Sequence, residues 1–239
     1  MKRELLGVLF DAVTMDGAVT RALALTQTRS GAYVCTPNPE IVMLARNDPA
    51  LLEAVNNASL VLPDGAGIVW AAKRLLRPVP ERVAGYDFLL SLLGRLRGGV
   101  LIYGGRPGVA ERAAETIAAR YPNAAVCGAF DGYGDNEADV LAAIRRTRPA
   151  LVMVCLGAPR QELWMAAHTD LPVGLMAGLG GSVDILAGTA KRAPLWWRSH
   201  GLEWLYRLLS EPRRLRRQLR LPAFVLAVLR KRREEKRGL

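Results

Sequence analysis

Short apolar runs alternate with longer segments of helical periodicity along most of this chain. The runs predict strands at residues 5–10, 32–36, 60–62, 100–103, 124–127, 151–156 and 173–177. The segments between them predict helices at about residues 17–29, 39–57, 66–76, 86–97, 107–121, 135–147 and 159–169. This alternation is typical of βα units. We therefore expect an α/β fold with a Rossmann-like, mostly parallel sheet flanked by helices.

Four turns at predicted strand ends concentrate glycine, proline and polar residues. They lie at residues 36–39, 63–65, 104–107 and 157–159. In an open α/β sheet, ligands bind outside the carboxyl ends of the strands. We therefore look for functional residues in these four turns.

The pattern changes after Pro194, where tryptophan, tyrosine and arginine interleave and leucines recur at roughly helical spacing. Residues 191–239 hold 15 of the 33 Lys and Arg residues but 4 of the 22 Asp and Glu residues, so this segment carries the whole net charge of +11. The sequence predicts an α/β catalytic domain at residues 1–194 and a basic, amphipathic helical appendage at 195–239.

Two kinds of partner suit this appendage. Its arginines and aromatic rings can bind nucleic acid through phosphate contacts and base stacking, or they can bind an anionic membrane surface. Interfacial tryptophan and the Leu/Phe/Val face favour the membrane. The tryptophan-rich stretch at 195–206 is equally suited to a homo-oligomer interface. No apolar run approaches the length of a spanning helix, so we expect peripheral attachment.

The cysteines and histidines of the chain exclude some classes of chemistry. Cys35, Cys127 and Cys155 are scattered in apolar stretches, which indicates reduced core thiols and a cytoplasmic compartment. The two histidines are not spaced as metal ligands, and no Asp-x-Asp pair is present. These features predict chemistry that needs no metal and no other cofactor.

Asp64 follows a predicted strand and precedes Gly65-Ala66-Gly67. A carboxylate at a strand end beside small residues can act as a general base. It can also simply cap the helix that begins at residue 66, and position alone favours the cap.

The other turns offer groups that can bind a sugar or a phosphate. Thr36 and Asn38 can hydrogen-bond sugar hydroxyls, although Asn38 can also cap the helix from Pro39. Gly104 and Gly105 let backbone N–H groups approach a phosphate, and an empty tight turn explains them equally well. In the first turn of a later helix, Arg160 and Gln161 are suited to a diphosphate or a sugar.

Taken together, these motifs resemble those of the WecG/TagA/CpsF family of bacterial glycosyltransferases. The residues that carry the resemblance are Thr36-Pro37-Asn38, Leu62-Pro63-Asp64-Gly65, Gly157-Ala158-Pro159-Arg160-Gln161-Glu162, Gly178-Leu179-Gly180-Gly181-Ser182, Arg192-Ala193-Pro194, Gly201-Leu202-Glu203-Trp204-Leu205-Tyr206-Arg207 and Glu211-Pro212-Arg213-Arg214. The likeness covers roughly residues 5–220.

The resemblance implies an inverting, membrane-associated transfer of an N-acetylmannosamine-type sugar. The donor is expected to be a UDP-sugar, and the acceptor N-acetylglucosamine on undecaprenyl diphosphate, as in teichoic acid synthesis. It also implies that Asp64 is the base and that Thr36, Asn38 and Gln161 line its pocket. Arg82 matches the family's basic residue near the active site and is expected to offset diphosphate charge.

Arg213 and Arg214 in the appendage are expected to reach either the substrate diphosphate or lipid headgroups. The expected location is the cytoplasmic face of the cell membrane. The competing hypothesis is a nucleotide- or nucleic-acid-binding α/β protein whose basic appendage holds phosphate backbones.

Overall fold

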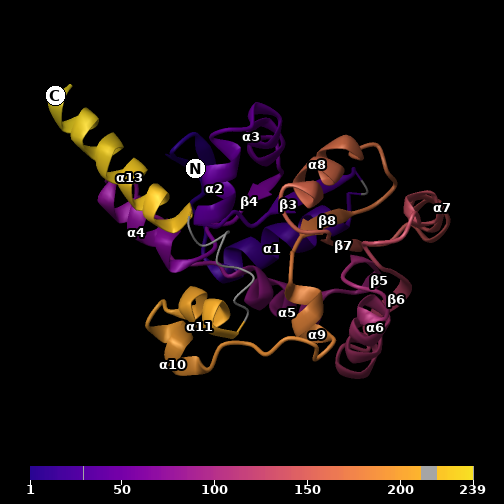
Figure 1. Cartoon of the computed structure of the whole chain (residues 1–239). Helices are drawn as coiled ribbons and strands as arrows, with labels where there is room; N and C mark the ends of the chain where they lie inside the picture. Colours follow the sequence, from indigo (N-terminus) through magenta and orange to yellow (C-terminus); the bar gives the residue numbers. More distant parts are fainter. Residues whose placement is uncertain (29, 211–219, 239) are drawn as a thin grey trace.

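The computed structural model describes residues 1–28, 30–210 and 220–238 and shows a six-stranded parallel sheet covered by helices on both faces (Figure 1). The strand order is β4-β3-β8-β7-β5-β6, and every neighbouring pair is parallel. These strands are β3 (Ala32–Cys35), β4 (Leu60–Val61), β5 (Gly98–Gly104), β6 (Ala124–Phe130), β7 (Leu151–Cys155) and β8 (Leu175–Gly178). The predicted fold class is confirmed.

The first predicted strand, at residues 5–10, is wrong. The structure has instead an antiparallel hairpin of β1 (Lys2–Leu5) and β2 (Val8–Asp11), which forms a sheet of its own. The chain reverses at Leu6 and Gly7, whose φ angles are +53° and +94°. Positive φ at both central residues is what a type I′ two-residue hairpin turn requires, and the apolar run conceals that turn.

The body of the chain contains nine helices within the described residues. They are α1 (Met15–Thr26), α2 (Pro39–Ala45), α3 (Pro49–Asn56), α4 (Ala66–Arg74), α5 (Gly85–Arg95), α6 (Val109–Arg120), α7 (Glu137–Thr147), α8 (Arg160–Ala167) and α9 (Ser182–Leu186). The continuous helix predicted at 39–57 is wrong, because it breaks before Pro49. Asp48 caps α3 by accepting a hydrogen bond from the Leu51 N–H at 3.1 Å.

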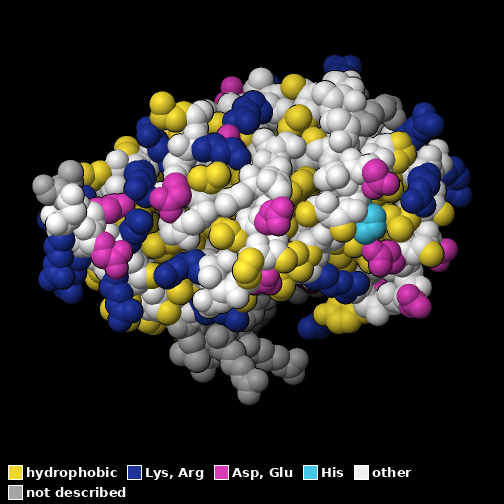
Figure 2. All heavy atoms as spheres, turned by 90° about the horizontal axis from the view of Figure 1, so that it is seen from above, with side chains coloured by type: hydrophobic (Ala, Val, Ile, Leu, Met, Phe, Trp, Pro, Cys, Tyr) yellow, Lys and Arg dark blue, Asp and Glu magenta, His cyan; other side chains and the backbone are white. Residues whose placement is uncertain are grey.

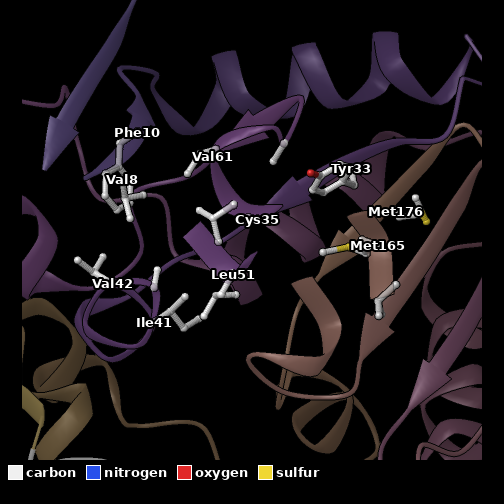
Figure 3. Packing of buried hydrophobic residues seen from close by; sticks show 14 of the residues in the cluster. Val8, Phe10, Tyr33, Cys35, Ile41, Val42, Leu51, Val61, Met165 and Met176 are labelled. Carbon is white, nitrogen blue, oxygen red and sulfur yellow. The ribbon is translucent and has the colours of Figure 1, made fainter. Parts of the chain in front are cut away.

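The core lies on both faces of the parallel sheet. Successive side chains of a strand point to opposite faces, so Tyr33 and Cys35 join one buried cluster while Val34 joins the other. Figure 3 shows the first cluster, in which Cys35 lies between Val61 and Leu51. A sheet buried on both faces explains why its strands are continuous apolar runs rather than alternating ones.

The predicted appendage forms the helices α10 (Leu195–Ser199), α11 (Glu203–Ser210) and α13 (Arg220–Arg237). The N-terminal part of α13 packs against α2 and α4, and its far end projects from the body (Figure 1). Phe224 and Val228 of this helix are fully buried. Arg77 of the body pairs with Glu235 at 2.8 Å and with Glu4 at 2.6 Å. Across residues 1–28, 30–210 and 220–238, we find no helix both long and apolar enough to cross a membrane.

Candidate functional site

A pocket of about 330 Å³ lies at the carboxyl ends of β3 and β4. Asn38 from the loop after β3 and Asp64 from the loop after β4 line it, together with Arg82. The remaining walls come from the start of α2, α4, the start of α5, Arg192, Gly201, and residues of α11 and α13. The body and the appendage therefore form this pocket jointly, at the sheet edge where we expected ligands to bind.

Asp64 does not cap α4. The N-cap residue of that helix is Gly65, with a φ of +91°, and no side chain caps the helix. The cap interpretation of Asp64 is therefore wrong. Its side chain is 26% exposed and faces the pocket, where Oδ1 lies 3.9 Å from Nε of Arg82.

Arg82 stands between two carboxylates. Besides its approach to Asp64, it donates from a terminal guanidinium nitrogen to Glu203 of α11 at 2.6 Å. The backbone N–H of Val83 donates to the carbonyl of Pro63 at 3.0 Å, which holds the two loops together. The side chains of Arg82 and Glu203 are 23% and 14% exposed. Because partial burial reduces screening by water, these charges interact more strongly than surface charges do.

Asn38 and Thr36 lie in different positions relative to the pocket. Asn38 lines the pocket, and its Oδ1 also caps α2 by accepting from the Ile41 N–H at 3.1 Å, so the predicted cap is confirmed. Thr36 is buried behind the pocket wall and donates to the carbonyl of Gly178 at 2.9 Å, which ties β3 to β8. A Cβ on the pocket residue Gly85 would come within 3.3 Å of the Thr36 hydroxyl.

The glycine turn after β5 lies outside this pocket. A Cβ on Gly104 would lie 2.4 Å from the backbone of Cys155, so this glycine is required by close packing of β5 on β7. Gly105 donates its N–H to the carbonyl of Cys155. Binding of a phosphate by Gly104 and Gly105 stays a prediction.

Arg160 and Gln161 also lie outside the pocket, at the start of α8. Gln161 is buried; it donates to Glu162 at 2.8 Å and accepts from the N–H of Gly180 at 3.0 Å. Arg160 donates to the carbonyl of Gly132 at 2.8 Å. These contacts join the loops that follow β6, β7 and β8, and substrate contacts of Arg160 and Gln161 stay predictions. Arg213 and Arg214 lie outside the described residues.

Sequence reasoning missed three charged or polar residues of the site. Glu203 pairs with Arg82, and Arg192 donates to Asp87 while its guanidinium stacks 4.9 Å from the ring centroid of Tyr86. Burial raises the pKa of Tyr86 above its ordinary value, although Arg192 lowers it. The phenol therefore stays protonated at neutral pH and can donate a hydrogen bond in the pocket. Arg192 and Glu203 each fall in a motif that carries the family resemblance, which is the signal that could have found them.

The charges of this pocket suit a reaction that removes a proton and releases a negatively charged group. Throughout the part of the chain that the structure describes, no three or more His, Cys, Asp and Glu side chains gather so as to hold a metal ion. The pocket combines a carboxylate that can accept a proton with arginines that can offset negative charge.

A carboxylate and arginines at the carboxyl edge of an α/β sheet are groups that a group-transfer enzyme can use. The model of the glycosyl transferase WecG/TagA/CpsF family matches residues 3–238, and the chain belongs to this family. It is therefore a glycosyltransferase.

Curated relatives carry the name N-acetylglucosaminyldiphosphoundecaprenol N-acetyl-beta-D-mannosaminyltransferase. One from Bacillus spizizenii is 37% identical over 203 residues, which cover 83% of this chain and 79% of the relative. One from Bacillus subtilis is 35% identical and covers 86% of this chain and 82% of its own. One from Staphylococcus aureus is 33% identical and covers 99% of this chain and 96% of its own.

Proposed function

We propose that this chain transfers N-acetylmannosamine from a UDP-sugar to N-acetylglucosamine carried on a polyprenyl diphosphate. The names of the relatives support the sugar and the acceptor. The observation that carries the chemistry is the pocket in which Asp64 faces Arg82 at 3.9 Å. This pairing supplies a proton acceptor and a cation within one small volume.

In the proposed reaction, Asp64 accepts the proton of an acceptor hydroxyl while the oxygen attacks the anomeric carbon. The new carbon–oxygen bond forms as the bond from that carbon to the UDP phosphate oxygen breaks, and UDP leaves with the electron pair. A single displacement inverts the anomeric centre and needs one general base. Arg82 and Arg192 offset the charge on the diphosphate. No metal is needed in this scheme.

The test measures UDP release from UDP-N-acetylmannosamine with and without a short-chain lipid diphosphate–N-acetylglucosamine. We expect acceptor-dependent release that persists in EDTA. Asp64→Asn is expected to lower turnover about 10²–10⁴-fold, the usual contribution of a general base. Asp16→Asn is the matched control, because Asp16 also pairs with an arginine but is 85% exposed and lies outside the pocket. Near-normal turnover of Asp64→Asn removes Asp64 from the mechanism.

We further propose that the appendage attaches the enzyme peripherally to an anionic membrane on its cytoplasmic face. The second half of α13 carries Arg230, Lys231, Arg232 and Arg233. Figure 2 shows Lys and Arg side chains gathered at the end of the molecule where this half of α13 lies. Each basic residue near an anionic surface contributes about 1 kcal/mol.

Flotation with vesicles checks this attachment. We expect binding to vesicles that contain anionic lipid and much weaker binding to neutral vesicles. Replacing Arg230, Lys231, Arg232 and Arg233 together by glutamate is expected to abolish this binding. Tighter binding to duplex or single-stranded nucleic acid than to anionic vesicles at equal salt would contradict the proposal.

A further inference from the structure

The mouth of the Asp64 pocket is ringed by large apolar side chains that face solvent. Trp70, Trp204 and Val225 line the pocket and are 40%, 42% and 39% exposed. We call these three residues the apolar rim. Exposed apolar groups that cluster around a pocket mark a binding surface rather than chance exposure.

The apolar rim exists only where three separate elements meet. Trp70 belongs to α4 of the body, Trp204 to α11 and Val225 to α13 (Figure 1). The rim is therefore not the apolar face of one amphipathic helix. Trp196 of α10 is more exposed, at 58%, yet lies outside the pocket.

Behind the rim the pocket is charged. The side chains of Asp64, Arg82 and Glu203 are 26%, 23% and 14% exposed, so these charged groups are less accessible to solvent than the apolar rim. Apolar side chains at the mouth add binding free energy for a ligand in proportion to the apolar surface that it buries there. This order of polarity, charged inside and apolar outside, is complementary to a ligand whose polar head continues into an apolar chain.

On the proposed function, the acceptor is such a ligand, since its sugar diphosphate continues into an isoprenoid chain. We propose that the apolar rim binds the isoprenoid units nearest the diphosphate, so that the chain leaves the pocket across Trp70. The occupant is the acceptor's own chain, and contact with bulk bilayer lipid is the competing outcome of the test. This inference rests on the proposed function for the identity of the acceptor.

Binding without transfer tests the rim directly. The probes are farnesyl diphosphate, below its aggregation threshold, and inorganic diphosphate, measured by titration calorimetry with no bilayer present. Removing about 55 Å² of apolar surface from water corresponds to a tenfold gain in affinity. We expect farnesyl diphosphate to bind at least tenfold more tightly than inorganic diphosphate.

Variants separate the rim from other exposed apolar groups. Trp70→Ala and Val225→Ser are expected to lose most of the gain from the farnesyl chain, with thermal unfolding used to check that they fold. Trp196→Ala is the control and is expected to keep the gain. Equal affinity of the wild-type protein for the two probes overturns the inference, as does an equal loss in Trp70→Ala and Trp196→Ala. An effect of Trp70→Ala that needs vesicles assigns the rim to bulk lipid and also overturns it.

Transfer assays distinguish failure of the inference from failure of the proposed function. With acceptors that carry one or three isoprene units, we expect the longer chain to lower KM about tenfold in the wild type and much less in Trp70→Ala. Transfer with a KM independent of chain length overturns the rim alone. Absence of transfer together with rim-dependent binding of farnesyl diphosphate overturns the proposed acceptor reaction alone.

Discussion

Replacing Glu203 by glutamine tests how the appendage controls the site. In the wild type, Arg82 is held 2.6 Å from Glu203 and 3.9 Å from Asp64. Without the Glu203 charge, Arg82 is expected to move onto Asp64 and form a full ion pair with it. A carboxylate paired in this way accepts a proton less readily, so the same change weakens both the anchoring of the appendage and the chemistry.

The structure sets the size of both effects. Two unit charges about 4 Å apart attract by about 4 kcal/mol at an effective dielectric constant of about 20. The cost of removing water from both groups offsets much of this, which leaves about 1–2 kcal/mol for a pair that is 14–23% exposed. In a chain of this size, that loss alone lowers Tm by about 2–8 °C, and the new Arg82–Asp64 pair restores part of it. The new Arg82–Asp64 pair stabilises the ionised Asp64 carboxylate by the same amount, about 1–2 kcal/mol. This raises the barrier to proton transfer and lowers kcat about 5–30-fold.

Glu235→Gln is the matched control. Glu235 is also an appendage carboxylate that pairs with an arginine of the body, Arg77 at 2.8 Å, but it lies outside the pocket. We expect it to lower Tm slightly and to leave kcat unchanged. The assays are thermal unfolding and steady-state UDP release. A wild-type kcat in Glu203→Gln, despite a lowered Tm, would refute the idea that Glu203 keeps Arg82 away from Asp64.

Three further predictions concern stability. In a denaturant titration, Gly104→Ala is expected to cost about 2–5 kcal/mol of unfolding free energy, because the φ of Gly104 is +134° and the new Cβ would lie 2.4 Å from backbone atoms. Gly108→Ala is the comparison. Gly108 has a φ of +80° but open space around it, so the expected cost is about 1–2 kcal/mol. Burial raises the pKa of Cys155 to about 12. The buried thiol therefore contributes fully to the free energy of unfolding below about pH 9, where the unfolded thiol also stays protonated. This contribution is lost as pH rises toward 12. Cys155→Ala is expected to flatten that alkaline loss in denaturant titrations across this range, and an unchanged slope would contradict burial of the thiol. Asp48→Ala removes the cap of α3 and is expected to cost about 1 kcal/mol, measured by thermal unfolding.

The sheet was predictable because its strands are apolar runs, several of which are followed by glycine, proline or asparagine. The first run misled because Leu6 and Gly7 form a turn inside it, and a composition pattern does not report backbone φ. The helix at 39–57 misled because apolar periodicity continues across Pro49, whereas the missing N–H of proline ends one helix and starts the next.

The residues of the candidate site were also predictable only in part. The resemblance implied that Thr36, Asn38 and Gln161 line the pocket of Asp64. Asn38 and Asp64 do line one pocket, whereas Thr36 and Gln161 lie outside it. Glu203 was not predicted as a site residue, because its contact with Arg82 spans 121 residues of sequence and depends on how the appendage packs on the body. The contacts of Gln161 with Glu162 and Gly180 were equally hidden, since a polar side chain at a strand end serves a ligand or a neighbouring loop with the same sequence pattern.

The two ion pairs of Arg77 become available at different times during synthesis of the chain. Glu4 is available as soon as Arg77 leaves the ribosome, whereas Glu235 follows 158 residues later. At a translation rate of about 5–20 residues per second, that interval is about 8–32 s. For this time Arg77 can pair only with the hairpin, and its second partner arrives with α13. Two elements made far apart in time thus meet at one guanidinium group.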